Sequence, residues 1–272
     1  HPVSWHHFFP VNIIGDRRLI TIHNKTDGFG SQLQACFSLI AYCHFKGYEY
    51  IHTPFTRMQH NDNNISNFPS IMNTFINLEE KFRSQSSLTK GEITTLHGRQ
   101  EGPYVHGTFH PEYFYNETVR NILRECYYSK PKPDLSSLYT EGAFNVAVHI
   151  RRGDVNATKY PSRFIGNDVY LNHLQKYSFP PNSQIHVFSE GSVEDFKDIQ
   201  QLYPNARFHL SSEIKTTFHA MVRADLLIIS KSSFSYCAGL LNQNRVDGSL
   251  IAKWWHKPLK QWEFVIMNTD SY

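Results

Sequence analysis

The sequence lacks any apolar run near the roughly 20 residues that a transmembrane helix needs, and no signal peptide opens it. Charge of one sign is also scarce: 27 Lys and Arg stand against 24 Asp and Glu, a net charge of +3, and the basic residues are dispersed. This balance argues against a nucleic-acid partner. Hydrophobic residues make up 40% and charged residues 19% of the 272, which excludes a disordered or fibrous chain.

Cysteine is scarce as well. The four cysteines show neither the spacing of metal ligands nor a disulfide framework. Cys36 and Cys43 are seven apart in an expected helix, about 10 Å along its axis, which is too far for a bridge. Cys36 and Cys237 lie in apolar segments, which favours buried, reduced thiols.

Four glycosylation sequons begin at Asn24, Asn64, Asn116 and Asn156. Asn24 precedes the glycine-rich segment 27–33 and Asn156 follows the arginine-rich segment 148–154, so a glycan at either would crowd a ligand there. These sequons and the reduced thiols favour a cytoplasmic location. Because the first residue is His rather than Met, a lumenal chain that has lost an anchor is the alternative.

Short apolar strands alternate with helices along the chain, and 272 residues suffice for one large domain or two sharing a cleft. Strands are expected at 19–22, 48–53, 104–109, 144–150, 184–188, 207–210 and 225–230, and helices at 31–45, 71–82, 111–127, 168–176, 193–202, 215–223 and 234–241. This alternation predicts an α/β fold with parallel sheets covered on both faces. Lys130-Pro131-Lys132-Pro133 predicts a boundary between residues 1–133 and 134–272, and the polar stretch 56–102 is expected to shape the substrate site.

The strongest motif is a strand that runs into two arginines, Val148-His149-Ile150-Arg151-Arg152-Gly153-Asp154. The planar guanidinium suits bidentate contacts with phosphate. In parallel sheets ligands bind beyond the carboxyl ends of the strands, so the arginine pair predicts a diphosphate clamp. A surface ion-pair cluster is the alternative. Arg152-Gly153-Asp154 is also an adhesion-type tripeptide, which its place at a strand end disfavours.

A glycine-rich segment, Asp27-Gly28-Phe29-Gly30-Ser31-Gln32-Leu33, lies between an expected strand and helix. Its two glycines let backbone amides approach a ligand, and a helix N-terminus favours negative charge. Leu33 replaces the third glycine of the dinucleotide fingerprint and no Walker lysine follows, which disfavours NAD binding and P-loop hydrolysis. A simple turn capped by Ser31 is the alternative.

A third motif, Ser230-Lys231-Ser232-Ser233-Phe234-Ser235, places hydroxyls between a buried strand and a helix. Hydroxyl groups and free amides at such a point hold phosphate oxygens. An ordinary N-cap cluster has the same sequence pattern, so this motif supports the other two and does not stand alone.

Together the three motifs resemble the fucosyltransferase superfamily of α-1,2-, α-1,6- and protein O-fucosyltransferases. His149 to Asp154 resembles its first conserved motif, Gly28 to Leu33 its glycine-rich loop, and Ser232 to Tyr236 a segment that reads Ser-Thr-Phe-Ser-Trp-Trp in the α-1,2 group. Here Tyr236-Cys237 replaces the Trp-Trp pair, and the chain is short for two full Rossmann-like domains. The resemblance implies a GT-B-like fold with a compact or trimmed N-terminal acceptor half and a C-terminal half that binds a nucleotide-sugar.

The activity that this resemblance implies is an inverting, metal-independent transfer of L-fucose from GDP-fucose to a glycan or glycoconjugate acceptor. Arg151 would bind the diphosphate, and Asp27, Asp154 or Glu190 would act as the base, with Asp27 preferred. The implied donor-binding residues are Gly28, Gly30, Gln32, His149, Arg152, Glu190, Ser232, Ser233, Phe234 and Ser235. Glu190 has a second interpretation as a ligand of the nucleoside.

A metal cofactor is not expected. No Asp-x-Asp occurs in the sequence, so arginines would do what a divalent cation does elsewhere. His106 and His110 have a ligand-type spacing and His6-His7 are adjacent, but Pro111 interrupts a common helix face. Trp254, Trp255 and Trp262 are expected to pack the C-terminal tail rather than to form a sugar platform.

Three alternatives stay open. A donor such as UDP-xylose would need the same arginines. A non-catalytic carbohydrate- or nucleotide-binding module would retain the fold, although it would not require the arginine pair that is intact here. An unrelated phosphate-handling enzyme such as a kinase is disfavoured, because the kinase signatures are missing.

Overall fold

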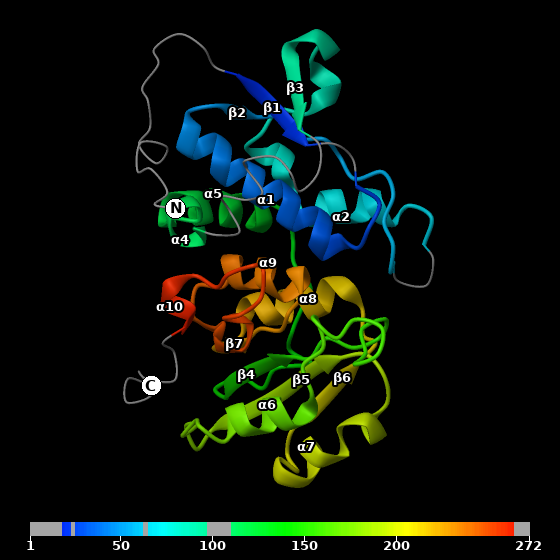
Figure 1. Cartoon of the computed structure of the whole chain (residues 1–272), viewed down its shortest axis with the longest axis vertical. Helices are drawn as coiled ribbons and strands as arrows, with labels where there is room; N and C mark the ends of the chain where they lie inside the picture. Colours follow the sequence, from blue (N-terminus) through cyan, green and yellow to red (C-terminus); the bar gives the residue numbers. More distant parts are fainter. Residues whose placement is uncertain (1–17, 23–24, 62–64, 97–109, 264–272) are drawn as a thin grey trace.

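The computed structural model describes residues 18–22, 25–61, 65–96 and 110–263, which form two parallel β-sheets (Figure 1). The first has the order β2-β1-β3, formed by β1 (Leu19–Ile22), β2 (Glu49–Tyr50) and β3 (Ile93–Leu96). The second has the order β6-β5-β4-β7-β8, formed by β4 (Phe144–His149), β5 (Ser183–Ser189), β6 (Arg207–Leu210), β7 (Leu226–Ile228) and β8 (Arg245–Asp247). The predicted α/β architecture of Rossmann-type parallel sheets is confirmed, and the N-terminal sheet is the smaller of the two.

Helices cover the sheets and fill the space between them. In the N-terminal half they are α1 (Phe29–Lys46), α2 (Phe68–Ile76), α4 (Pro111–Phe114) and α5 (Glu117–Tyr128). In the C-terminal half they are α6 (Asn167–Leu174), α7 (Lys197–Leu202), α8 (Ile214–Arg223), α9 (Ser233–Leu241) and α10 (Lys260–Glu263). Figure 1 shows α8 and α9 on the face of the second sheet toward α1 and α5, and α6 and α7 on its other face. None of these described helices is long and apolar enough to cross a membrane.

The central strand β4 is buried on both faces, as a nearly continuous apolar run predicts. Val146 and Val148 belong to the core beneath α6 and α7, whereas Ala147 belongs to the core beneath α8 and α9. The alternation follows from the two-residue period of a strand. Because His149 is the next residue on the Ala147 face, its ring lies near Phe234 of α9, 6.0 Å between centroids.

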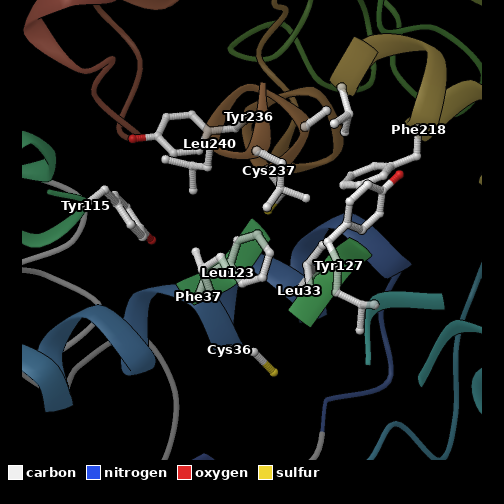
Figure 2. Packing of buried hydrophobic residues seen from close by; sticks show 14 of the residues in the cluster. Leu33, Cys36, Phe37, Tyr115, Leu123, Tyr127, Phe218, Tyr236, Cys237 and Leu240 are labelled. Carbon is white, nitrogen blue, oxygen red and sulfur yellow. The ribbon is translucent and has the colours of Figure 1, made fainter. Parts of the chain in front are cut away.

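A single apolar core joins the two halves of the chain. Figure 2 shows Leu33 and Phe37 of α1 and Leu123 of α5 facing Cys237 and Leu240 of α9. All five side chains are at most 3% exposed.

Burial raises the pKa of Cys36 to about 11 and that of Cys43 to about 12, and all four cysteines are free and buried. The expectation of buried, unbridged thiols is confirmed.

Polar contacts also join the halves. Arg120 and Arg124 of α5 are buried, and their guanidinium groups donate to the carbonyls of Leu240, Leu241 and Asn242 at the end of α9. These carbonyls have no partners within the helix, and positive charge is favourable at a helix C-terminus. The division of the chain at residue 133 stays a prediction, since α5 precedes it and packs on a helix that follows it.

Four elements differ from the sequence-based expectation. The helix expected at 111–127 is two helices, because the Asn116 side chain accepts the Val119 N–H at 3.0 Å and starts a new one. The strand expected at 48–53 pairs with β1 only over Glu49–Tyr50, since the chain turns to bridge His52 with Ser84. Strands β3 and β8 were not expected from the polar sequence around them. The strand expected at 104–109 lies outside the described residues.

Candidate active site

The carboxyl ends of both sheets open into one cavity of about 390 Å³. From the first sheet it is lined by the segment after β1, residues 27–31, and by Gln59 and His60 after β2. From the second it is lined by the segments after β4, β5, β6 and β7. The order of the second sheet reverses between β4 and β7, and such a switch point is where ligands bind in open parallel sheets.

Arg151 follows β4 at this switch point. Its guanidinium donates to a carboxylate oxygen of Asp154, to Glu190 Oε1 at 3.4 Å and to the carbonyl of Arg152 at 2.6 Å. Its side chain is 22% exposed, so the group is held in place and still accessible from the cavity. The Arg151 N–H also donates to Ser230 Oγ after β7, at 3.4 Å, which ties the two strand ends together.

Arg152 and Gly153 stabilise the conformation of the turn that follows β4. Arg152 donates to Asn167 Oδ1 at 2.6 Å and lies over the ring of Phe164, 4.5 Å from its centroid. Burial lowers the pKa of Arg152. Gly153 has φ +74°, and a Cβ there would lie 1.9 Å from Glu190 Oε2, so only glycine fits while Glu190 holds this position. Both arginines are half-buried and line the cavity, Arg152 anchored by these contacts and Arg151 by its two carboxylates, while the diphosphate clamp itself stays a prediction.

The start of α9 forms the next wall of the cavity. Ser232 Oγ accepts the Phe234 N–H at 3.3 Å as the N-cap. Ser233 Oγ donates to Gln34 Oε1 of α1, which leaves its lone pairs for a ligand. The Phe234 ring packs against the rings of Phe29 and Phe218. Ser232, Ser233 and Phe234 all line the cavity, and their binding of a donor stays a prediction.

The glycine-rich segment forms the opposite wall. Gly30 is in close contact with α9: a Cβ there would lie 2.5 Å from Phe234 N and 2.6 Å from its Cα. Gly28 has more room, since the nearest atom to an added Cβ is 3.6 Å away in His60. Both glycines line the cavity, but Gly30 also permits the approach of α1 to α9, a role that the sequence motif does not reveal.

Two residues predicted to bind the donor do not line the cavity. Gln32 is 4% exposed, and its amide donates to the backbone carbonyls of Asp27 and Arg57, 2.7 Å each. Ser235 is fully buried, and its hydroxyl accepts the Ser230 N–H at 3.2 Å. Both therefore hold the shape of cavity loops rather than face a ligand, because their side chains point inward from the first turn of a helix.

Unpartnered polar atoms gather around the cavity. Four buried side-chain polar atoms lack a hydrogen bond in the described part of the chain, and three of them belong to cavity residues: Asp27 Oδ1, His149 Nδ1 and Trp254 Nε1. Burial and the charge of Arg151 lower the pKa of His149 to about 3, so its imidazole is neutral near pH 7. Buried polar groups are normally paired, so such a concentration marks a place where a ligand completes the hydrogen bonding.

Of the three carboxylates predicted as candidate bases, Asp27 is the one that does not pair with Arg151. Its Oδ2 accepts the Ser31 hydroxyl and lies 3.2 Å from Lys25 Nζ, while its Oδ1 is the unpartnered atom. Asp154 and Glu190 both engage Arg151 instead. All three residues line the cavity, and the preference for Asp27 as the base stays a prediction.

Several cavity residues had no signal in the sequence. His60 has φ +55°, and its Nε2 lies 3.9 Å from Asp154 Oδ2. His209 stacks on Phe188, with centroids 4.8 Å apart. Trp254 and Trp255, expected to pack the tail, do pack in the apolar core and also line the cavity. These residues come from segments far apart in the chain, so no local spacing connects them.

In the described part of the chain, no group of three or more His, Cys, Asp or Glu side chains is placed to hold a metal ion. Of the histidines with ligand-type spacing, His6, His7 and His106 lie outside the described residues.

No family model matches the sequence, and no curated protein does. In fold the chain is similar to fucosyltransferase NodZ from Bradyrhizobium, with 10% identity and a TM-score of 0.45 over 85% of this chain and 95% of that one. It is also similar to POFUT1 in complex with GDP, with 12% identity and a TM-score of 0.47 over 84% and 96%. The E. coli heptosyltransferase WaaC has 10% identity and a TM-score of 0.37, over 84% of this chain and 88% of that one. None of these likenesses extends beyond the fold.

Proposed function

We propose that the chain is an inverting glycosyltransferase, with GDP-fucose as donor and a hydroxyl of a carbohydrate or glycoconjugate as acceptor. The observation that supports this most is the meeting of Arg151, the start of α9 and an open cavity at the switch point between β4 and β7. A diphosphate suits this point, because a guanidinium and a helix N-terminus both favour its negative charge.

Donor binding would exchange one partner of Arg151. The contact with Glu190 is long, 3.4 Å, and the Glu190 side chain is 53% exposed, so a phosphate oxygen replaces it at little cost. Asp154 stays on the other side of the guanidinium and keeps it oriented. Glu190, which lines the cavity together with Ser189 and His209, would once released be free to accept hydrogen bonds from the nucleoside.

The reaction would proceed by attack of the acceptor oxygen on the anomeric carbon. The bond from this carbon to the β-phosphate oxygen breaks, its electron pair goes to the departing diphosphate, and Arg151 stabilises the new charge. Asp27 Oδ1 accepts the proton of the acceptor hydroxyl. Lys25 and Ser31 hold the other oxygen of Asp27 and thereby orient the carboxylate.

The identity of the donor and the absence of a metal have separate support. Fucose and guanine follow from the resemblance of segments 149–154, 28–33 and 232–236 to the fucosyltransferases. A metal is left out of the proposal because the sequence has no Asp-x-Asp and because Arg151 supplies positive charge at the diphosphate.

A ligand screen tests the proposal. Thermal unfolding would be followed with GDP, UDP, GDP-fucose and UDP-xylose, each with and without EDTA. A ligand at about 100 times its Kd adds about 2.7 kcal/mol to the free energy of unfolding, roughly 5–10 °C for a chain of this size. GDP-selective stabilisation that EDTA does not change is the expected result, and transfer from GDP-fucose to a glycan mixture would be followed by mass spectrometry.

The other outcomes are equally informative. UDP-selective binding with transfer from UDP-xylose would support Arg151 as the diphosphate ligand and would identify UDP-xylose rather than GDP-fucose as the donor. Binding without any transfer or donor hydrolysis would favour a non-catalytic module. Absence of binding to every nucleotide would refute the proposed site.

A further inference from the structure

The cavity has two ends, which lie on opposite sides of Arg151. Strand β4 is central in the order β6-β5-β4-β7-β8, so the segments after β5 and β6 lie on one side and those after β7 and β8 on the other. The first end contains Glu190, His209, Ser211 and Ser212. We call the second the basic-aromatic end, defined by Tyr160, Arg163, Lys231, Trp254 and Trp255.

The two ends differ in charge and in hydrogen-bonding groups. The first end offers a carboxylate, two hydroxyls and a stacked ring pair, which suit the base and ribose of a nucleotide. The basic-aromatic end contains two cations and no carboxylate. A nucleotide whose diphosphate lies at Arg151 therefore extends toward the first end and leaves the second end free.

The cations of the basic-aromatic end are available to a ligand. The Arg163 guanidinium lies over the rings of Tyr160 and Trp255, 5.5 Å from each centroid. Lys231 Nζ donates to the carbonyl of Ser162 at 3.2 Å. Neither cation forms an ion pair with a carboxylate among the residues that the structure describes, in contrast to Arg151, which has two such partners. Two unpaired cations on one cavity wall favour an anion.

Trp254 supplies an independent indication of a ligand. Its side chain is 4% exposed, lines the cavity, and has an indole N–H for which residues 18–22, 25–61, 65–96 and 110–263 supply no acceptor. A buried donor without a partner costs about 1–3 kcal/mol, which a ligand oxygen would recover. Trp255 next to it is half-buried, with its ring 5.2 Å from that of Trp254, and indole faces pack well against the C–H surface of a sugar.

We propose that the basic-aromatic end is the acceptor subsite and that it takes a sugar carrying an anionic substituent, a carboxylate or a phosphate. Trp255 packs against the ring, Arg163 and Lys231 meet the anion, and the Trp254 indole N–H donates to a ligand oxygen. The assignment rests on the proposed function, because the donor is what occupies the centre and the first end of the cavity.

The test compares matched sugars on the protein saturated with GDP. Saturation-transfer NMR would measure the binding of methyl β-glucuronide, methyl β-glucoside 6-phosphate and neutral methyl β-glucoside. The wild-type protein should prefer an anionic sugar over the neutral one by about tenfold, the ratio expected for one charge-assisted hydrogen bond. The carboxylate and phosphate arms show which anion is preferred.

Variants of Arg163 identify the origin of this preference. Arg163→Gln should abolish it, Arg163→Lys should retain most of it, and the Kd for GDP should change less than threefold in both. Arg83→Gln is the control, because Arg83 pairs with Glu49 on the surface outside the cavity lining. Thermal unfolding would verify that each variant is folded.

Three results would separate the possible failures. Equal binding of neutral and anionic sugars to wild-type protein would overturn the inference, as would an unchanged preference in Arg163→Gln. Absence of GDP binding would refute the proposed function, whereas the sugar comparison, repeated without nucleotide, would still decide whether this end selects an anion.

Discussion

Replacement of Arg151 by alanine separates catalysis from folding more sharply than any other change in the cavity. The guanidinium is the group proposed to stabilise charge on the departing diphosphate. Its partners in the free protein are Asp154 and Glu190, whose side chains are 30% and 53% exposed. Arg151→Ala would therefore remove the main electrostatic contact of the proposed reaction. For the stability of the fold, it would remove only a partly solvated ion pair.

The two effects differ in size. Loss of one preorganised contact to a developing negative charge lowers kcat by about 100- to 1000-fold, or about 2.7–4 kcal/mol. Loss of an ion pair with this much solvent exposure changes the free energy of unfolding by about 0–1 kcal/mol. For a chain of 272 residues this lowers Tm by no more than about 4 °C.

The assay would combine initial rates of donor turnover at saturating donor with thermal unfolding of the same samples. Arg83→Ala is the matched control, because it removes an arginine from an exposed pair with Glu49. Arg151→Ala should lose kcat with a nearly unchanged Tm, and Arg83→Ala should change neither by much. A folded Arg151→Ala protein with kcat within about fivefold of wild type would refute the role of this arginine, since no contact worth 2.7 kcal/mol would have been lost.

Two further predictions concern the frame of the site. Gly30→Ala should lower the free energy of unfolding by about 1–3 kcal/mol, because the added methyl would lie 2.5 Å from Phe234 N. Gly28→Ala is the control and should stay within about 0.5 kcal/mol of wild type. Equal midpoints of urea unfolding for the two variants would contradict this prediction. Burial would raise the pKa of Asp247, but contacts with His173 and other donors lower it overall, so its stabilising contribution is complete above pH about 4 and is lost as the pH falls through the lower folded value. Asp247→Asn should lower the free energy of unfolding by about 1–3 kcal/mol at pH 7. In denaturant titrations at several pH values, this variant should lose less stability in acid than the wild type. An unchanged pH dependence of unfolding would refute the stabilising role of the Asp247 carboxylate.

Much of the second sheet was predictable because its strands are buried on both faces. Apolar runs such as 144–150 have few interpretations other than a central parallel strand. By contrast, β8 has a single apolar residue, Val246, between Arg245 and Asp247, and it is a strand only because its backbone pairs with β7. Its burial is decided by the neighbouring strand, which no local pattern reveals.

The candidate site was predictable where chemistry and chain position coincide. Arg151, Ser232 and Gly28 follow strands or begin helices, so parallel topology alone brings them to one edge. Gln32 has the same kind of position but points into the protein, because the first turn of α1 has an inward and an outward face. The direction of one side chain on a known helix depends on the packing of that helix, and the sequence motif contains no information about it.

The width of the cavity is set by the packing of the two halves rather than by the motifs that line it. Gly30 of α1 touches the backbone of Phe234 in α9, and Arg120 and Arg124 of α5 bind the other end of α9. Helix α9 is thus held by the N-terminal half at both of its ends. A rigid-body opening between the sheets would break the Gly30 contact and leave buried guanidinium groups without partners, at a cost of several kcal/mol. A donor bound as we propose would therefore meet walls that are already in place, and Glu190 is the side chain that would have to leave Arg151.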